Sequence, residues 1–247
     1  TITDTAVVIN EDSDDVDFRV ESNGNANMLV IDGGDDIMAI GAAKSTSATV
    51  KIQNKDDSNT NTLDLFNDNG NRTFSIQQNT SGDAQFKAFK NDGTQGFTLV
   101  GDGSVTNPLQ PAFHVTKSGA QDNIATDTTV TITFDTEVFD QNADFASNTF
   151  TAPVTGRYQL NATLYGRDVD KDATYVELKI KTSNRTHYCV VDPDNTNDSE
   201  YHSFNFSVLA DMDASDTAFI EFSQSGGDAQ TDIQGSHTTT FSGYLAC

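Results

Sequence analysis

Aspartates are the residues of this chain whose type and spacing could do chemistry. They gather in three segments of the C-terminal half, where acidic residues recur at every second or fourth position. The candidate metal ligands are Asp168, Asp170, Asp172, Asp192, Asp194, Asp198, Asp228 and Asp232. Hard carboxylate oxygens at such spacing are the ligands that Ca²⁺ prefers. The sequence therefore predicts a calcium site or a receptor-facing acidic surface in these segments.

The segment that begins at Asp192 departs from the pattern of an EF-hand calcium loop. Its sixth position is Asn197 and its twelfth is Ser203, where such a loop requires Gly and Glu. Solvated acidic loops explain the same composition, because charged residues are usually exposed. Calcium is the one cofactor that the sequence suggests, and a plain solvated surface is the alternative.

Motifs for catalysis are missing from the sequence. It contains no G-x-S-x-G nucleophile elbow, no Walker loop and no dinucleotide-binding fingerprint followed by a helix. The four histidines lie outside any H-E-x-x-H pattern. Carboxylate pairs are too numerous here to mark a glycosidase. We therefore expect a protein that binds and assembles, and not an enzyme.

The charge balance limits the partners. The chain has 14 Lys and Arg against 37 Asp and Glu, a formal net charge of -23, which repels nucleic acid and anionic lipid surfaces. No apolar run approaches the roughly 20 residues that span a bilayer, so we expect no membrane insertion. Thr1 is followed by no signal-like apolar run, which is typical of a fragment or a processed form.

Glycines in Asn- and Asp-rich contexts mark repeated hairpins in the N-terminal part. Apolar residues flank Gly24, Gly70 and Gly93 at the same offsets, four before and four and six after. Gly93 and Gly70 are 93 − 70 = 23 residues apart, and Gly70 and Gly24 are 70 − 24 = 46 apart, which is twice 23. The spacing predicts a degenerate unit in the gap, and such hairpins need neighbours to bury their apolar faces.

Prolines separate this repetitive part from a second one. Pro108 and Pro111 interrupt the pattern, and longer alternating runs follow. The fold class predicted is all-β, with a repetitive stalk over residues 1–107 and a β-sandwich head over 108–247. The predicted head strands are Thr128–Phe134, Arg157–Tyr165, Tyr175–Lys181, Thr186–Val191, Tyr201–Leu209, Thr217–Gln224 and Thr238–Leu245.

Reversal of direction at each connection predicts where the head loops lie. The acidic connections 166–172, 192–199 and 225–234 fall at one end of the sandwich under this rule. Connections 182–185 and 210–216 fall at the other end. The acidic segments are therefore expected to converge.

Residues 111–247 resemble the C1q-like head domain, the jelly roll that C1q shares with the tumour necrosis factor superfamily. The run Phe150-Thr151-Ala152-Pro153-Val154-Thr155-Gly156-Arg157-Tyr158 is similar to that family's F-x-x-P-x-x-G-x-Y signature. Thr240-Phe241-Ser242-Gly243-Tyr244-Leu245 is similar to its closing strand, whereas Ser215 replaces the Gly that the family has before Asp216. The resemblance implies a jelly-roll head, and some heads of this family bind calcium near the apex.

The N-terminal part resembles the repeats of phage tail and head fibres. Phrases such as Val16-Asp17-Phe18-Arg19-Val20-Glu21 and Ile37-Met38-Ala39-Ile40-Gly41 carry this resemblance. Both resemblances imply a homotrimer, with a β-prism-like stalk. The candidate residues at the trimer axis are Phe113, Tyr158, Phe241 and Tyr244. A place for each of the four in the core of the sandwich is the equal alternative.

Together the resemblances imply a virion fibre or spike, located outside the cell, that attaches to a host surface. The implied partners are sister copies, other virion proteins at the N-terminal end, and a glycan or protein of the host surface. The alternatives are a secreted or cell-surface bacterial adhesin or lectin-like protein, and a purely architectural capsid fibre.

Overall fold

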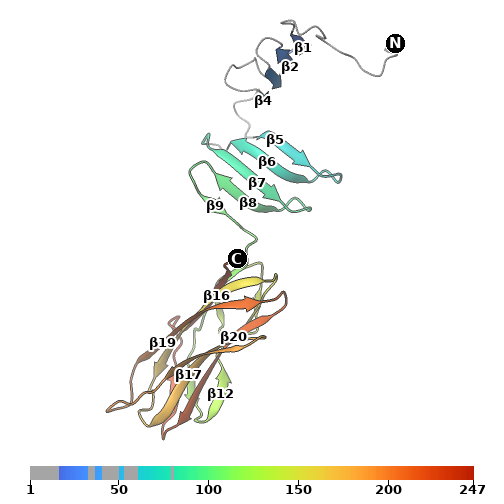
Figure 1. Ribbon diagram of the computed structural model, residues 1–247. Helices are drawn as coiled ribbons and strands as arrows, with labels where there is room; N and C mark the ends of the chain where they lie inside the picture. Colours follow the sequence, from blue (N-terminus) through green and yellow to red (C-terminus); the bar gives the residue numbers. More distant parts are fainter. Residues whose placement is uncertain (1–16, 33–36, 41–49, 53–60, 79–80) are drawn as a thin grey trace. The chain divides into compact units, whose positions relative to one another are not determined.

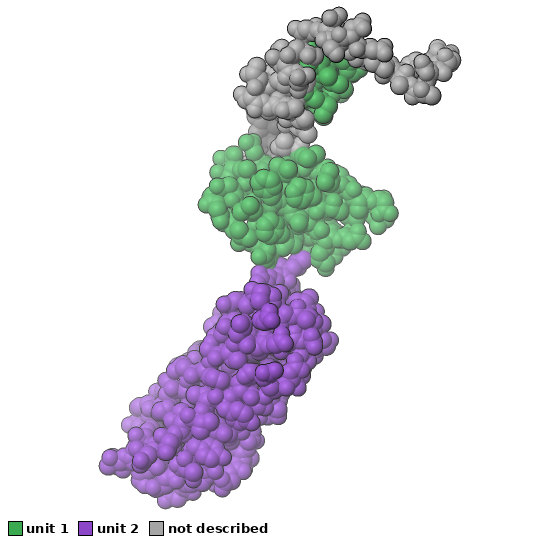
Figure 2. Space-filling view, in the orientation of Figure 1, with its two compact units in different colours: residues 1–108 green, residues 109–247 purple. Residues whose placement is uncertain are grey.

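The structure, a computed structural model, describes residues 17–32, 37–40, 50–52, 61–78 and 81–247. Within these ranges the chain forms β-strands and no helix, and so contains no helix that could cross a membrane. The chain divides into an N-terminal unit, residues 1–108, and a C-terminal unit, residues 109–247 (Figure 1, Figure 2).

The N-terminal unit begins with a four-stranded sheet. Its strands are β1 (Phe18–Ser22), β2 (Asn25–Asp32), β3 (Ile37–Ile40) and β4 (Val50–Ile52), in that order. β1 and β2 are antiparallel and enclose Gly24, which confirms the first predicted hairpin, whereas β3 and β4 are parallel. The predicted degenerate unit is centred 23 residues beyond Gly24, outside the described residues. Val16 and Gly41, which belong to the two segments that resemble phage fibre repeats, also lie outside the described residues.

A five-stranded meander follows in the same unit. Its strands are β5 (Asn61–Phe66), β6 (Arg72–Gln78), β7 (Ala84–Phe89), β8 (Gln95–Val100) and β9 (Val105–Thr106). The turns between β5 and β6 and between β7 and β8 contain Gly70 and Gly93, which confirms the other two hairpins. Gly93 adopts a φ of 85°, in the left-handed region that favours glycine, and its N–H donates to the carbonyl of Lys90 at 2.9 Å.

The C-terminal unit is a sandwich of two antiparallel sheets. Sheet I has seven strands: β10 (Ala112–Thr116), β11 (Gln121–Ile124), β13 (Thr136–Gln141), β16 (Gly156–Arg167), β19 (His202–Met212), β21 (Thr231–Ile233) and β22 (Thr240–Leu245). Its order is β11-β21-β16-β22-β10-β13, and β19 pairs with β16 from Gly156 to Gly166.

Sheet II faces sheet I with six strands. They are β12 (Thr128–Thr131), β14 (Phe145–Ala146), β15 (Thr149–Thr151), β17 (Ala173–Thr182), β18 (Thr186–Val191) and β20 (Thr217–Gly226). β17 lies between β18 and β20, and β12 pairs with β20. Each of the seven predicted head runs overlaps one strand of the two sheets, while β10, β11, β13, β14, β15 and β21 are not among the predicted runs.

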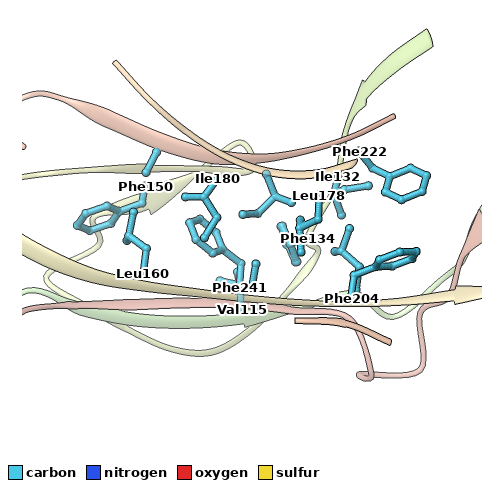
Figure 3. Close-up of a cluster of buried hydrophobic side chains, with 14 of the residues drawn as sticks. Val115, Ile132, Phe134, Phe150, Leu160, Leu178, Ile180, Phe204, Phe222 and Phe241 are labelled. Carbon is cyan, nitrogen blue, oxygen red and sulfur yellow. The ribbon is translucent and has the colours of Figure 1, made fainter. Parts of the chain in front are cut away.

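The core lies between the two sheets and follows from strand alternation. In β16 the buried residues are every second one, and β17 alternates in the same way. Leu160 of β16 and Phe241 of β22 point from sheet I toward Leu178 and Ile180 of β17 (Figure 3). One continuous hydrophobic cluster therefore fills the sandwich.

The segment from Phe150 to Tyr158 fixes one end of this core. Phe150 and Tyr158 are both fully buried, with ring centroids 5.4 Å apart. The hydroxyl of Tyr158 donates to the carbonyl of Val154 at 2.8 Å. Gly156 is required because a Cβ there would lie 2.7 Å from the carbonyl oxygen of Cys247. The predicted signature therefore has a packing explanation at each of these positions.

Candidate functional site

The acidic connections converge at one end of the sandwich, as strand reversal predicts. Val169, in the connection after β16, forms a two-way backbone bridge with Ser199, in the connection after β18. The backbone N–H of Lys171 donates to the carboxylate of Asp198 at 3.1 Å. The connection after β20 joins the group through Asp170, so all three acidic connections meet.

Asp170 is a buried carboxylate that braces the connection after β20. Its Oδ2 accepts hydrogen bonds from the N–H groups of Asp228 at 2.6 Å and Ala229 at 2.8 Å, and its Oδ1 accepts from the N–H of Asp172 at 2.8 Å. Burial alone would raise the pKa of Asp170, but these backbone donors outweigh it and hold the pKa below the ordinary value. The charged carboxylate of Asp170 therefore serves as the hydrogen-bond acceptor for three backbone N–H groups, in place of water.

Three of the eight predicted metal ligands form one group. Carboxylate oxygens of Asp170, Asp172 and Asp228 all lie within 4.8 Å of one another, with Asp170 buried and the other two exposed. Oxygen donors so close together fit a hard divalent cation such as Ca²⁺. Asp170 is already engaged by backbone donors, and Asp172 forms an ion pair with Lys171. The group is therefore stabilised without a metal ion.

The other five predicted ligands lie outside this group. Asp198 borders it through Lys171, while Asp192 accepts a hydrogen bond from the N–H of Asp194 within its own turn. Asp168 is 3.7 Å from Arg167, and Asp232 accepts from the N–H of Asn123 at 2.6 Å. Local turn geometry accounts for Asp192 and Asp194, and the sequence spacing had no signal to separate them from Asp170.

Replacing Asp170 with Asn is expected to destabilise the C-terminal unit by about 1.5–3 kcal/mol, the contribution typical of hydrogen bonds to a charged group. Because the folded pKa of Asp170 lies below its ordinary value of 3.8, the charge stabilises the fold above that pH and the stability is lost as pH falls through the folded pKa. Denaturant titrations at pH 7 and below pH 3 measure this difference, which should be largest at pH 7.

Asp168→Asn is the matched control for this variant. Asp168 is exposed and has a φ of 51°, a conformation that Asn tolerates well. The control should stay within about 0.5 kcal/mol of the native chain. Equal stability losses in the two variants would contradict the bracing role of Asp170.

Calcium is expected to leave the melting temperature unchanged at millimolar concentration, since Asp170 already accepts three backbone hydrogen bonds and Asp172 pairs with Lys171. A bound ion would instead stabilise the fold by about 2.7 kcal/mol at one hundred times its dissociation constant. Thermal melts with CaCl₂ and with EDTA distinguish the two cases. A calcium-dependent rise that disappears in Asp228→Asn would establish a calcium site and contradict this expectation.

The structure contradicts the predicted position at the trimer axis for three of the four candidate residues. Phe113, Tyr158 and Phe241 are each 1% exposed or less in a single chain. The Phe113 ring packs 4.6 Å from Phe150 and 4.9 Å from Phe241. These side chains point into the sandwich and cannot face a sister chain. Tyr244, on the other side of β22, is 49% exposed and stays a predicted contact.

The central part of the outward face of sheet I, over β16 and β19, has no charged residue. Between Arg157 and Arg167, the outward residues of β16 are Gln159, Asn161, Thr163 and Tyr165. Their neighbours on β19 are uncharged, and side-chain hydrogen bonds join the strands, such as Gln159 to Ser207 at 2.8 Å. In a chain of net charge -23, this face is distinctive.

Large apolar side chains stand exposed on the same face. Leu209 is 53% exposed, and Phe139 of β13 is 50% exposed and packs edge-on against His114 at 6.1 Å. Neither residue was among the predicted contact residues. The alternation of β19 carried a signal for Leu209, because it continues the face of Ser203, Asn205 and Ser207. Phe139 belongs to a strand that was not predicted.

The β5–β9 sheet also leaves an apolar face uncovered. Cross-strand register places on this face Leu65, Phe74, Ala88 and Phe97 in one row, and Leu63, Ile76, Phe86, Leu99 and Val105 in the next. None of the nine is buried, and Leu65 and Phe86 are 51% and 41% exposed. We call this set the apolar meander face.

The opposite face of that sheet is polar and yet better covered. Ser75, Gln77 and Thr98 are buried, and Gln77 donates to Gln85 at 2.9 Å. Arg72 pairs with Asp64 at 3.0 Å. Hydrophobic surface in this unit therefore faces outward within a single chain, the reverse of the usual arrangement.

The β1–β4 sheet also exposes apolar residues on one face. Val20, Leu29 and Ile40 lie opposite one another in one row, and Phe18, Ile31 and Met38 lie in the next. Val20, Ile31 and Ile40 are exposed, whereas Val30 and Ala39 on the other face are buried. Both sheets of the N-terminal unit thus present apolar residues on one uncovered side.

Comparison with known proteins identifies the C-terminal unit. The C1q domain matches residues 112–246. Among solved structures, the globular domain of zebrafish complement 1qA is similar at 18% identity, over 56% of this chain and 98% of that chain, with a TM-score of 0.41. Murine APRIL is similar at 13% identity, over 55% and 98%, with a TM-score of 0.40. No curated protein sequence matches the chain.

The domain match covers the whole sandwich from β10 to β22. It confirms the predicted all-β fold class, with a C1q/TNF-like jelly roll in the C-terminal part. Because the match spans more than half of the chain, this protein belongs to the C1q domain family.

Proposed function

We propose that this protein is a homotrimeric virion fibre whose C1q-type head attaches to a receptor on the host surface. Under this proposal the N-terminal unit is the shaft and binds other virion proteins at its far end. C1q domains are typically extracellular modules that bind or build structures without enzymatic activity. The proposed mechanism is accordingly adhesion, in which no bond is made or broken.

The observation that carries the proposal is the uncovered apolar face of each N-terminal sheet, together with the uncharged outward face of sheet I. Burying one Phe or Leu side chain stabilises an assembly by about 1.5–3 kcal/mol. The apolar meander face has nine apolar positions, none of them buried, and an exposed apolar patch of this kind marks an interaction site. Packing against sister copies removes this surface from water.

The proposed number of chains and the proposed location on a virion rest on the resemblance to C1q-type heads and to phage fibres. C1q-type heads and phage fibre shafts both imply three chains around one axis, which gives every sheet a neighbour and protects its edge strands. The uncharged face of sheet I supports contact between heads, because a chain of formal net charge -23 would otherwise repel its copies. Three tips on one fibre raise the effective concentration of a weak receptor site.

Antibodies against the purified chain test the assignment on intact source particles. Labelling of fibres in electron micrographs, together with competition between the free protein and the particle for host cells, is the expected result. Release of the protein into the medium without particle labelling would overturn the virion assignment in favour of a secreted adhesin. Labelled particles whose attachment the free protein never reduces would leave only an architectural fibre.

A further inference from the structure

A groove of about 200 Å³ lies on the outward face of sheet II, on the far side of the sandwich from the uncharged face of sheet I. It lies over β17, β20 and β12, which run side by side (Figure 1). The residues that matter for its chemistry are Asp127, Tyr175, Glu177, Lys179, Ser223 and Ser225.

Strand register brings these side chains together. Tyr175 lies opposite Ser225, and Glu177 lies opposite Ser223. Glu177 Oε2 accepts from the Ser223 hydroxyl at 3.0 Å and is 2.8 Å from the ammonium of Lys179. Asp127 accepts from the N–H of Gly226 at 2.9 Å. The polar groups of the groove are thus held in place before any ligand arrives.

The groove keeps hydrogen-bonding capacity for a ligand. A carboxylate has about four acceptor positions and an ammonium has three donors. Glu177 receives Ser223 and Lys179 on one oxygen, Oε2, so among the described residues Oε1 is left for a ligand. Donors and acceptors alternate over a short distance, which is what the hydroxyl groups of a sugar require.

Charge and size narrow the ligand class. The two carboxylates, Asp127 and Glu177, outnumber the one ammonium, Lys179, so an anionic ligand is disfavoured in this acidic chain. The ring of Tyr175 offers an apolar surface for the C–H face of a pyranose. At about 200 Å³ the groove is smaller than the roughly 300–1,000 Å³ typical of drug-sized ligands, so it holds a single ring.

We propose that this groove binds one neutral sugar residue of a host-surface glycan. This inference rests on the proposed function, because host attachment supplies the ligand and the trimer multiplies a weak site. Assembly through sheet I leaves sheet II exposed, so three grooves face outward on one fibre. Binding through several grooves at once converts a weak single contact into durable attachment.

Binding of the full-length protein to immobilised oligosaccharides tests the groove. The probes are neutral hexose and N-acetylhexosamine oligosaccharides, with sialylated and sulfated ones beside them. The native chain is expected to bind neutral probes in preference to acidic ones. Glu177→Gln should weaken that binding about tenfold or more, because a charged hydrogen-bond acceptor is lost. Tyr175→Ala should weaken it as well.

Glu221→Gln is the matched control. Glu221 lies on the same face and pairs with Lys181 at 3.2 Å, but it does not line the groove. This variant should bind the probes as the native chain does, and thermal melts confirm that each variant is folded. Failure of the native chain to bind any neutral probe would overturn the groove proposal. So would binding that Glu177→Gln leaves unchanged.

The outcomes that contradict sugar binding by the groove differ from those that contradict the virion fibre. A trimer that attaches to host cells but binds no neutral sugar contradicts the groove alone. A chain that binds neutral sugars through Glu177 but stays monomeric and is absent from particles supports the groove and contradicts the virion fibre. Light scattering and particle labelling on the same preparation separate these outcomes.

Discussion

Phe86→Asp on the apolar meander face is expected to convert the assembly into monomers. Phe86 lies on β7, in the row between Ile76 and Leu99. In the proposed trimer each of the three chains buries its Phe86 side chain. Because Phe86 is 41% exposed before assembly, its lost burial costs about 0.6–1.2 kcal/mol per copy, which for three copies lowers the association constant by about one to three powers of ten. Three new carboxylates near one axis add repulsion. Sedimentation velocity measures the change directly.

Asn69→Asp adds the same charge in the exposed turn between β5 and β6, away from the apolar face. This control should sediment as the native protein does. The fold of Phe86→Asp is checked by its far-UV circular dichroism, because a single exposed position leaves the sheet itself intact. A folded Phe86→Asp variant that remains fully assembled would contradict the assignment of this face to sister contacts.

Phe113→Ala is expected to destabilise the C-terminal unit by about 3–5 kcal/mol, as is typical when a buried Phe leaves a cavity. The Phe113 ring is stacked against Phe145 and Phe150 at 5.3 and 4.6 Å and meets Phe241 edge-on at 4.9 Å. All these partners belong to the same chain. Denaturant titration of the head transition measures the loss.

Tyr244→Ala is the informative companion, since Tyr244 pairs with Ala112, next to Phe113, and its side chain lies on the opposite side of sheet I. It should change the unfolding free energy of the isolated chain by no more than about 0.5 kcal/mol. It should weaken assembly instead. A Phe113→Ala variant as stable as the native chain would contradict the placement of Phe113 in the core.

Alternation and glycine spacing predicted much of the fold, because both reflect local geometry. The hairpin at Gly93 and the strand from Tyr201 to Leu209 follow from the turn conformation and the two-residue period. Phe113 and Phe241 are residues whose positions local geometry did not predict. A strand with an apolar side faces either its own core or another chain, and local sequence does not distinguish the two.

The acidic connections show the same limit. Strand reversal correctly predicted that they converge. The special role of Asp170 depends on the backbone N–H groups of Asp228 and Ala229, which lie far away in sequence. The groove over sheet II likewise arises only when β12, β17 and β20 are placed side by side. Such sites depend on non-local register, which residue spacing along one chain does not reveal.

Molar mass in solution tests the central claim most directly, because both the shaft and the display of the head depend on sister contacts. Light scattering coupled to size-exclusion chromatography at physiological ionic strength should report three times the 26.6 kDa of one chain, about 80 kDa. A stable species of 26.6 kDa that persists at high protein concentration would contradict the account.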